Sequence, residues 1–231
     1  MRIIAHRSGP RIYPEQTILS AKDALTQGAD MIEIDVRSTS DKKLAVFHDD
    51  AAGRILGVDK EICDMTATEF LSLRHKENPE FCPHVFEDYL KCSIAPLLIH
   101  IKQDEVFEEL FGLINQYNYA DKVVIGAVSL DFVKRVKKEY PQVKVLAFMN
   151  GADDSAVFAD AGADYIRFWQ GWINEERLSA VRSTGKELWI MTSGSDVGVP
   201  TKENLLKTLA IKPDGILIND VTFLKECMEE I

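Results

Sequence analysis

Residues 28–36 read Gly-Ala-Asp-Met-Ile-Glu-Ile-Asp-Val, and they combine a helix end with the start of a strand. The glycine is typical of the point where a helix ends, and the apolar run after it is typical of a parallel strand buried on both faces. Glu33 and Asp35 interrupt that run two residues apart, so both carboxylates leave the same face of the strand. Charges on a buried strand are costly unless they are paired or bind a metal ion. The stretch therefore predicts a buried strand that carries a polar site.

Similar apolar runs recur along the chain, and segments with a helical period separate most of them. The expected strands are Ile3–His6, Met31–Val36, Leu44–His48, Pro96–Lys102, Val123–Val128, Lys144–Met149, Asp164–Trp169, Glu187–Thr192 and Gly215–Asn219. Repeated strand–helix units over 231 residues predict an α/β fold, either a (β/α)8 TIM barrel or a doubly wound sheet. Nine strands are expected, which is one more than a (β/α)8 barrel contains. About seven residues around Asp41 are too few for a helical crossover, so we expect a hairpin there.

Helix starts are visible in the segments between the strands. Thr66 and Glu69 have the spacing of a capping box, and Asn174 and Thr201 are expected N-caps. Pro14 stands where the first helix is expected to begin.

No linker, composition break or block of charge divides the chain, so we expect a single domain over residues 1–231.

The composition excludes several classes of protein and of partner. With 46% hydrophobic and 28% charged residues, the chain is typical of globular proteins rather than of collagen-like or disordered ones. A formal net charge of −10 and the lack of a basic stripe argue against nucleic-acid binding. No apolar run reaches the ~18–20 residues that span a bilayer, so we expect no membrane insertion. Four cysteines without CxxC spacing are expected to be reduced, which predicts a cytoplasmic protein.

Ionisable side chains gather where the first strands end, and in barrels the C-terminal strand ends carry the active site. Glu33 and Asp35 offer hard oxygen donors that suit Mg²⁺, Ca²⁺ or Mn²⁺. Arg7 is suited to bidentate contacts with a phosphate. Histidines such as His6 and His48 are the usual general acids and bases near neutral pH. Each residue alone has a structural explanation, but their conjunction predicts a metal-assisted phosphate site.

The next strand ends with His100 and Lys102, which leave the same strand face. Lys102 is suited to hold a phosphate or to stabilise a leaving oxygen, and His100 is either a metal ligand or a hydrogen-bonding group. Farther on, Gly162-Ala-Asp-Tyr-Ile-Arg-Phe echoes residues 28–34. A glycine that ends a helix before a strand explains the echo. The register also sets Arg167 in the strand position of Glu33, which is expected at the barrel mouth.

The motifs of residues 3–49 resemble, in order and spacing, the pattern HRG, PENT, GADxIExDV, TxDG and VxxHD of the glycerophosphodiester phosphodiesterase family. This family belongs to the PLC-like phosphodiesterase superfamily. The matching stretches are His6-Arg-Ser-Gly, Pro14-Glu-Gln-Thr, residues 28–36, Thr39 with Asp41, and Val46-Phe-His-Asp49. Weaker similarity at Asp64–Leu73, His100–Lys102, Glu187–Thr192 and Asp214–Asp220 extends the resemblance over nearly the whole chain.

The resemblance implies a distorted TIM barrel and metal-dependent hydrolysis of a glycerophosphodiester, a small molecule, to an alcohol and sn-glycerol 3-phosphate. It also implies that residues 50–92 form an insertion near the active-site mouth. The implied site residues are His6 and His48 as acid and base, Glu33, Asp35 and His100 at the metal, and Arg7, Lys102, Glu15 and Trp189 at the phosphate and substrate. A place in the barrel core is the alternative for Trp189.

Two departures from the family pattern bear on the site. Ser8 stands in the position of the HRG glycine, with Gly9 one residue later. His100 stands where the family has a glutamate that ligates the metal. Because imidazole is neutral and softer than carboxylate, a Glu, Asp and His set favours Mn²⁺ or Zn²⁺ over the Mg²⁺ or Ca²⁺ that the resemblance implies. Alternatively, His100 does not ligate, and the two carboxylates and water hold the ion.

Three functions fit these motifs. The first is a phosphodiesterase that hydrolyses glycerophosphodiesters. The second is a lysophospholipid or sphingolipid headgroup phosphodiesterase, in which Phe168, Trp169 and Trp172 would form an apolar lip. The third is a relative that has lost catalysis and binds a phosphodiester, as the changes at Ser8 and His100 suggest. The retained ionisable residues favour the first.

Overall fold

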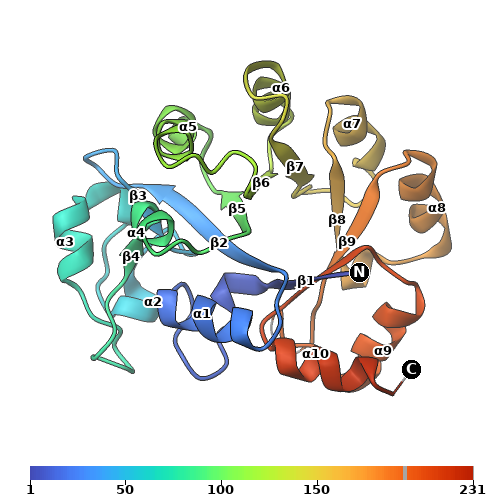
Figure 1. The fold of residues 1–231 in the computed structure, drawn as a ribbon, viewed down its shortest axis with the longest axis horizontal. Helices are drawn as coiled ribbons and strands as arrows, with labels where there is room; N and C mark the ends of the chain where they lie inside the picture. Colours follow the sequence, from blue (N-terminus) through green and yellow to red (C-terminus); the bar gives the residue numbers. More distant parts are fainter. Residues whose placement is uncertain (195–196, 231) are drawn as a thin grey trace.

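In a computed structural model, which describes residues 1–194 and 197–230, the chain forms a closed barrel of eight parallel strands surrounded by helices (Figure 1). The barrel strands are β1 (Arg2–Ala5), β2 (Met31–Ser38), β5 (Leu97–Ile101), β6 (Val123–Ala127), β7 (Lys144–Ala147), β8 (Tyr165–Trp169), β9 (Glu187–Met191) and β10 (Gly215–Ile218). The barrel closes because β1 pairs with β10 on one side and with β2 on the other. The prediction of a TIM barrel is confirmed.

The outer layer consists of helices that bury an apolar face against the strands. They are α1 (Ile18–Thr26), α4 (Phe86–Lys91), α5 (Phe107–Gln116), α6 (Leu130–Glu139), α7 (Ser155–Asp160), α8 (Glu175–Ser183), α9 (Lys202–Ala210) and α10 (Val221–Met228). Asn174 and Thr201 cap α8 and α9 as predicted. The prediction for Pro14 is wrong, because Thr17 caps α1 and the segment before it turns back toward β1. None of the helices described is both long and apolar enough to span a bilayer.

The predicted hairpin around Asp41 is present. Strand β3 (Leu44–Val46) runs antiparallel to β2, with Val36 opposite Val46. The turn places Lys42 in the left-handed region, at a φ of 61° that favours glycine. A two-residue strand, β4 (His84–Val85), then pairs antiparallel with β3. The surplus strand of the prediction is thus β3, which lies outside the barrel, and the barrel itself keeps eight strands.

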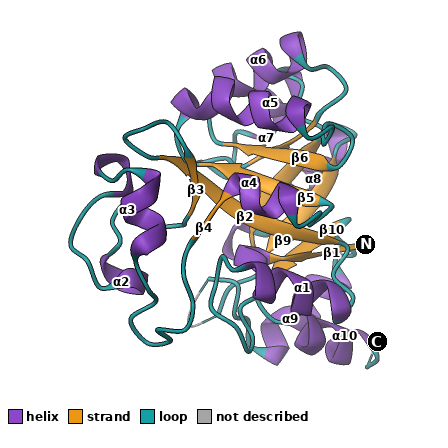
Figure 2. Cartoon of the chain, turned by 60° about the vertical axis from the view of Figure 1, so that its left-hand side comes forward, coloured by secondary structure: helices purple, strands orange, loops and turns teal. Residues whose placement is uncertain are grey.

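Between β3 and β4 the chain forms a small lobe beside the barrel, and Figure 2 shows its two helices apart from the other helices. The helices are α2 (Gly53–Leu56) and α3 (Ala67–Ser72), and the predicted capping box of Thr66 and Glu69 begins α3. Its own apolar cluster consists of Ala45, Phe47, Ala52, Leu56, Ile62, Met65 and Phe70. The lobe is thus a packed unit, which holds α2 in place beside the end of β3.

The barrel interior is apolar in its middle, between the ionisable groups at the C-terminal strand ends and the Arg2–Glu187 ion pair at the N-terminal ends. The interior cluster consists of Ile4, Met31, Leu98, Val124, Leu146, Phe148, Trp189, Met191 and Leu217. Within it, the Trp189 ring is wholly buried and stacks on Tyr165, with ring centroids 4.6 Å apart. This apolar filling closes the barrel from below and leaves its upper end as the place for a site.

The helix–barrel interface is expected to dominate the stability of the fold. Leu110 on α5 is wholly buried, so Leu110→Ala should lower the free energy of unfolding by about 2–5 kcal/mol. Leu19 on α1 is 47% exposed, and Leu19→Ala should change it by no more than about 0.5 kcal/mol. Urea denaturation measures both, and equal effects would contradict the described packing.

Candidate active site

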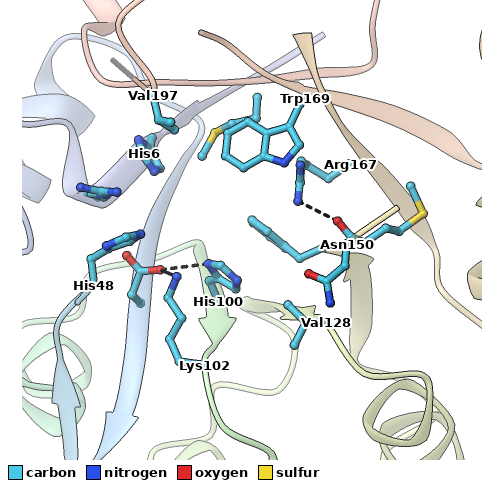
Figure 3. Close-up of a pocket in the computed structure, with 14 residues that line it drawn as sticks. His6, His48, His100, Lys102, Val128, Asn150, Arg167, Trp169 and Val197 are labelled. Carbon is cyan, nitrogen blue, oxygen red and sulfur yellow. Dashed lines mark hydrogen bonds and ion pairs between the residues drawn. The ribbon is translucent and has the colours of Figure 1, made fainter. Parts of the chain in front are cut away.

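A cavity of about 400 Å³ opens at the C-terminal ends of the barrel strands (Figure 3). One half of its wall is ionisable and consists of His6, Arg7, Asp35, His48, His100 and Lys102. The other half is mostly apolar and consists of Val128, Phe148, Met149, Asn150, Arg167, Trp169, Met191 and Val197. The structure therefore brings six of the predicted site residues to one cavity.

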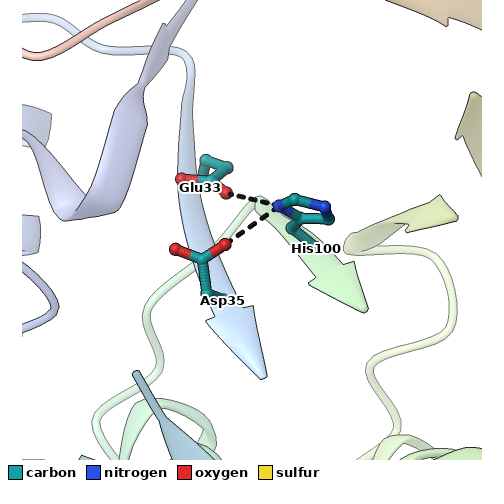
Figure 4. A group of neighbouring side chains, drawn as sticks. All are labelled: Glu33, Asp35 and His100. Carbon is teal, nitrogen blue, oxygen red and sulfur yellow. Dashed lines mark ion pairs between the residues drawn. The ribbon is translucent and has the colours of Figure 1, made fainter. Parts of the chain in front are cut away.

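Two predicted metal ligands come from neighbouring positions on adjacent strands. The register of β2 and β5 sets Asp35 opposite His100, and His100 Nδ1 lies 2.9 Å from Asp35 Oδ1 and 3.8 Å from Glu33 Oε1. Figure 4 shows all three side chains converging on one point between the strands. One ligand atom from each lies within 4.8 Å of the others.

Two carboxylate oxygens of this cluster lack a hydrogen-bond partner among the described residues: Glu33 Oε1 and Asp35 Oδ1, both buried. Lys102 Nζ and His100 Nδ1 lie 2.8 Å and 2.9 Å from Asp35 Oδ1 as ion pairs, whereas His100 Nδ1 lies 3.8 Å from Glu33 Oε1. Buried acceptors without donors are costly. A divalent cation satisfies both oxygens, so the three side chains fit a metal ion.

The charges of the cluster agree with this geometry. Burial, and then Asp35, raises the pKa of Glu33 well above its ordinary value. Burial alone would raise the pKa of Asp35, but Lys102 and His100 outweigh it and hold that pKa well below the usual range. Burial, followed by Lys102, lowers the pKa of His100 to about 4. The imidazole is therefore neutral near pH 7, as a metal ligand must be.

The loop after β1 adopts an unusual backbone at the changed HRG motif. Arg7, Ser8 and Gly9 follow one another with φ angles of 48°, 68° and 71°, of which only the glycine tolerates the left-handed region without cost. At Gly9 a Cβ would also lie 2.8 Å from the Cβ of Ala24. The backbone N–H of Arg7 donates to Glu33 Oε2 at 2.7 Å. The turn thus supplies a donor to the buried carboxylate and sets Arg7 on the cavity wall.

The two predicted acid–base histidines are held in the same tautomer by different partners. His6 Nδ1 lies 2.6 Å from Asn219 Oδ1, and His48 Nδ1 lies 2.7 Å from Asp49 Oδ1. Both partners are acceptors, so each Nδ1 carries the proton and each Nε2 keeps its lone pair. Burial, with Arg7 next, lowers the pKa of His6 to about 3. Burial also lowers the pKa of His48, although Asp35 acts against it.

A chain of charged side chains links Arg7, the predicted phosphate-binding arginine, to His48. Glu15 lies 3.3 Å from Arg7 and 2.7 Å from Arg54 of α2. Arg54 also donates to both oxygens of Asp49, the partner of His48. Burial would raise the pKa of Glu15, but Arg54 and Arg7 hold it below its ordinary value. Glu15 thus stands behind the cavity wall and positions Arg7 from there.

Two contacts of the site were not predicted from the sequence. Gln16 Nε2 donates to Asp35 Oδ2 at 2.6 Å, so the changed residue of the PENT-like motif holds a metal-ligand candidate. Asn219 fixes His6 from the end of β10. The weak similarity of residues 214–220 to the family's last motif was the only sequence feature that pointed to this segment.

The aromatic residues take different places from those expected. Trp189 does not line the cavity but lies lower in the barrel, where its indole N–H donates to Glu187 at 3.3 Å. The substrate role expected for Trp189 is therefore corrected to its alternative, a core position. Of the proposed apolar lip, only Trp169 lines the cavity, whereas Phe168 is buried in the core and Trp172 packs against that core.

Comparisons with known proteins agree on the class of the chain. The sequence model of the glycerophosphoryl diester phosphodiesterase family matches residues 6–170. A glycerophosphodiester phosphodiesterase of Caldanaerobacter subterraneus is 30% identical over 235 residues, which cover 94% of this chain and 93% of that protein. An Oleispira antarctica phosphodiesterase, solved with the product sn-glycerol-3-phosphate, has a TM-score of 0.86 at 16% identity and covers 99% and 97% of the two chains. A human lysophospholipase D is 26% identical over 62% of this chain and 50% of its own length.

Together with the barrel and its site, these comparisons define the chain as a phosphoric diester hydrolase. It belongs to the glycerophosphoryl diester phosphodiesterase family. The resemblance seen in the motifs of residues 3–49 is thereby confirmed, and so is the class of enzyme that it implied.

The charged chain behind the cavity generates a prediction for Arg54. Arg54→Met should lower kcat/KM for phosphodiester hydrolysis by about 10-fold to 100-fold, because Asp49 and Glu15 lose the cation that fixes them. Arg74→Met in the same lobe is the matched control, since the hydrogen bonds of Arg74 to the described residues all go to backbone carbonyl groups. Steady-state kinetics, with the NMR signal of the His48 Nδ1–H proton, measure the effect. Equal rates for the two variants would show that Arg54 does not position the site.

Proposed function

We propose that the chain is a metal-dependent phosphodiesterase that hydrolyses glycerophosphodiesters to an alcohol and sn-glycerol 3-phosphate. The observation that carries the proposal is the pair of buried carboxylate oxygens, Glu33 Oε1 and Asp35 Oδ1, that have no hydrogen-bond partner among the described residues. They lie beside a cavity that also holds His6 and His48. The printed name of the Caldanaerobacter relative and the product bound in the Oleispira enzyme support the substrate class.

Glu33, Asp35 and His100 would hold the ion, and a bound divalent cation neutralises charge on a phosphate and on the oxygens that attack or leave it. The protein adds two cations of its own. Arg7 lines the cavity, and its Nε is buried without an acceptor in the described part of the chain. Lys102 lines the same wall. Both are suited to bind a phosphate oxygen beside the metal-ligand candidates, and Lys102 lies next to them through its ion pair with Asp35.

His6 and His48 then supply the proton transfers. One imidazole takes a proton from the nucleophile, either water or a neighbouring hydroxyl of the glycerol group. The nucleophile oxygen forms a bond to phosphorus while the bond from phosphorus to the alcohol oxygen breaks. The other imidazole must first take a proton from solvent at Nε2, and it then donates that proton to the leaving oxygen. The shared tautomer leaves Nε2 of each ring as the atom for these transfers.

A second candidate is a lysophospholipid headgroup phosphodiesterase, which the name of the human relative suggests. The long acyl chain of a lysophospholipid substrate would need a broad apolar surface at the cavity mouth. Of the three aromatic residues proposed for such a surface, only Trp169 reaches the cavity. The structure thus gives less support to a lipid substrate than to a small glycerophosphodiester.

We also propose a cytoplasmic location, which rests on the cysteines. Cys63, Cys82, Cys92 and Cys227 are all free thiols. Cys63 and Cys92 are exposed, and exposed thiols persist in reducing compartments.

Metal reconstitution tests the proposal. Protein stripped with a chelator should release no glycerol 3-phosphate from glycerophosphocholine or glycerophosphoethanolamine. Mn²⁺ or Zn²⁺ should restore more activity than Mg²⁺ or Ca²⁺, because one of the three ligands is an imidazole. His100→Glu should reverse this order, since a third carboxylate favours the harder ions.

Two histidine variants control the experiment. His48→Ala should lose more than about 10²-fold in rate with every ion while it still binds the metal in calorimetry. His84→Ala replaces a half-buried histidine that does not line the cavity and should turn over normally. Near-normal turnover by His48→Ala would sink the mechanism. Folded wild-type protein that is inactive with every ion would instead favour the lipid substrate or a binding protein without catalysis.

A further inference from the structure

The apolar half of the cavity wall contains a buried cation that the proposed hydrolysis does not use. Arg167 comes from β8, lines the cavity and is only 3% exposed. Its Nη2 donates to the carbonyl oxygen of Met149 at 3.2 Å. Nε and Nη1 are buried and have no hydrogen-bond partner in residues 1–194 and 197–230. Two nitrogen atoms of the guanidinium thus have no acceptor among the described residues, and the third donates to one carbonyl oxygen.

Aromatic rings surround this guanidinium instead of carboxylates. Its central carbon lies 4.4 Å from the ring centroid of Trp169, 5.1 Å from that of Phe148 and 5.2 Å from that of Trp172. The faces of aromatic rings stabilise a cation. They do not accept hydrogen bonds from the N–H groups, which point outward in the plane of the guanidinium. Burial lowers the pKa of Arg167 to about 9, so it is still charged at neutral pH. A buried charge without a counterion is costly, and an anion from outside the chain would satisfy it.

Arg167 lies apart from the groups assigned to the scissile phosphate. Figure 3 shows it across the cavity from His6 and His48, on the far side of His100. The Phe148 ring stacks on His100, with centroids 3.9 Å apart, and also contacts the guanidinium. Arg167 therefore faces a substituent of the phosphodiester rather than its phosphorus. The side-chain amide of Asn150 lines the same part of the cavity.

We propose that Arg167 binds a second anionic group, a carboxylate or a phosphate, on the alcohol portion of the substrate. This inference rests on the proposed function and deepens it, because it names the class of phosphodiester that the site prefers. The parallel N–H donors of a guanidinium suit both groups. The positive charge of Arg167 also disfavours a cationic alcohol such as choline, because the guanidinium already occupies the aromatic faces that would bind a quaternary ammonium group.

Matched pairs of substrates test the proposal. Glycerophosphoserine and glycerophosphoethanolamine differ only in a carboxylate, and glycerophosphoglycerol with and without a terminal phosphate differ only in that phosphate. For the wild-type enzyme, kcat/KM should be about 10-fold or more higher for the anionic member of at least one pair. The pair that shows the preference identifies the group as carboxylate or phosphate.

Variants assign the preference to this side chain. Arg167→Gln should bring the ratio of kcat/KM for the two substrates of the pair to about 1. Arg167→Lys should keep part of the preference for the anionic substrate, because a single charge remains. Arg182→Gln, an exposed arginine on α8, should leave the ratio unchanged. A preference that survives in Arg167→Gln would overturn the proposal.

The wild-type ratios keep the proposal testable even if the variants do not fold. Turnover of all four substrates with ratios close to about 1 would overturn the inference and leave the proposed function standing. No turnover of any of them, with the best ion present, would count against the proposed function itself.

Discussion

The burial of two carboxylates on one face of β2 is the constraint on which the rest of the structure depends. Glu33 and Asp35 are almost fully inaccessible to solvent, so the surrounding chain must supply donors and positive charge. The backbone N–H of Arg7, the amide of Gln16 and the ammonium group of Lys102 do so from three segments. They still leave two oxygens without hydrogen-bond partners among the described residues. The left-handed turn after β1 meets part of this demand, because it directs the Arg7 N–H at Glu33.

The fold separates stability from chemistry along the barrel axis. Apolar side chains fill the lower interior, whereas the ionisable groups stand at the strand ends. The lobe between β3 and β4 connects to that upper layer through Arg54, which fixes Asp49 and Glu15. A peripheral packed unit thereby holds both His48, a proposed acid–base residue, and Arg7, a proposed phosphate ligand. Arg167, on the opposite wall, is placed to decide which alcohol the site accepts.

Local patterns were sufficient to predict the barrel strands, the hairpin and the residues at the strand ends, because each pattern lies within a few residues of sequence. The contacts that hold the site were not predictable in this way. Gln16 meets its partner 19 residues away, and Asn219 meets His6 at a separation of 213 residues. Trp189 shows a further limit: it shares a strand face with Met191, but alternation does not tell which of them stands at the height of the cavity. The contacts of Gln16 and Asn219 and the height of Trp189 in the barrel all depend on how the barrel closes.

Anomalous diffraction from crystals grown with Mn²⁺ tests the metal site directly. We expect one anomalous peak in contact with the side chains of Glu33, Asp35 and His100, and loss of that peak in Asp35→Asn. The exposed group of Glu61, Cys63 and Asp64 is a built-in comparison, since its ligand types are similar but its oxygens are solvated. A peak at that exposed group alone, or no peak in the barrel mouth at saturating Mn²⁺, would show that the buried carboxylates do not form a metal site.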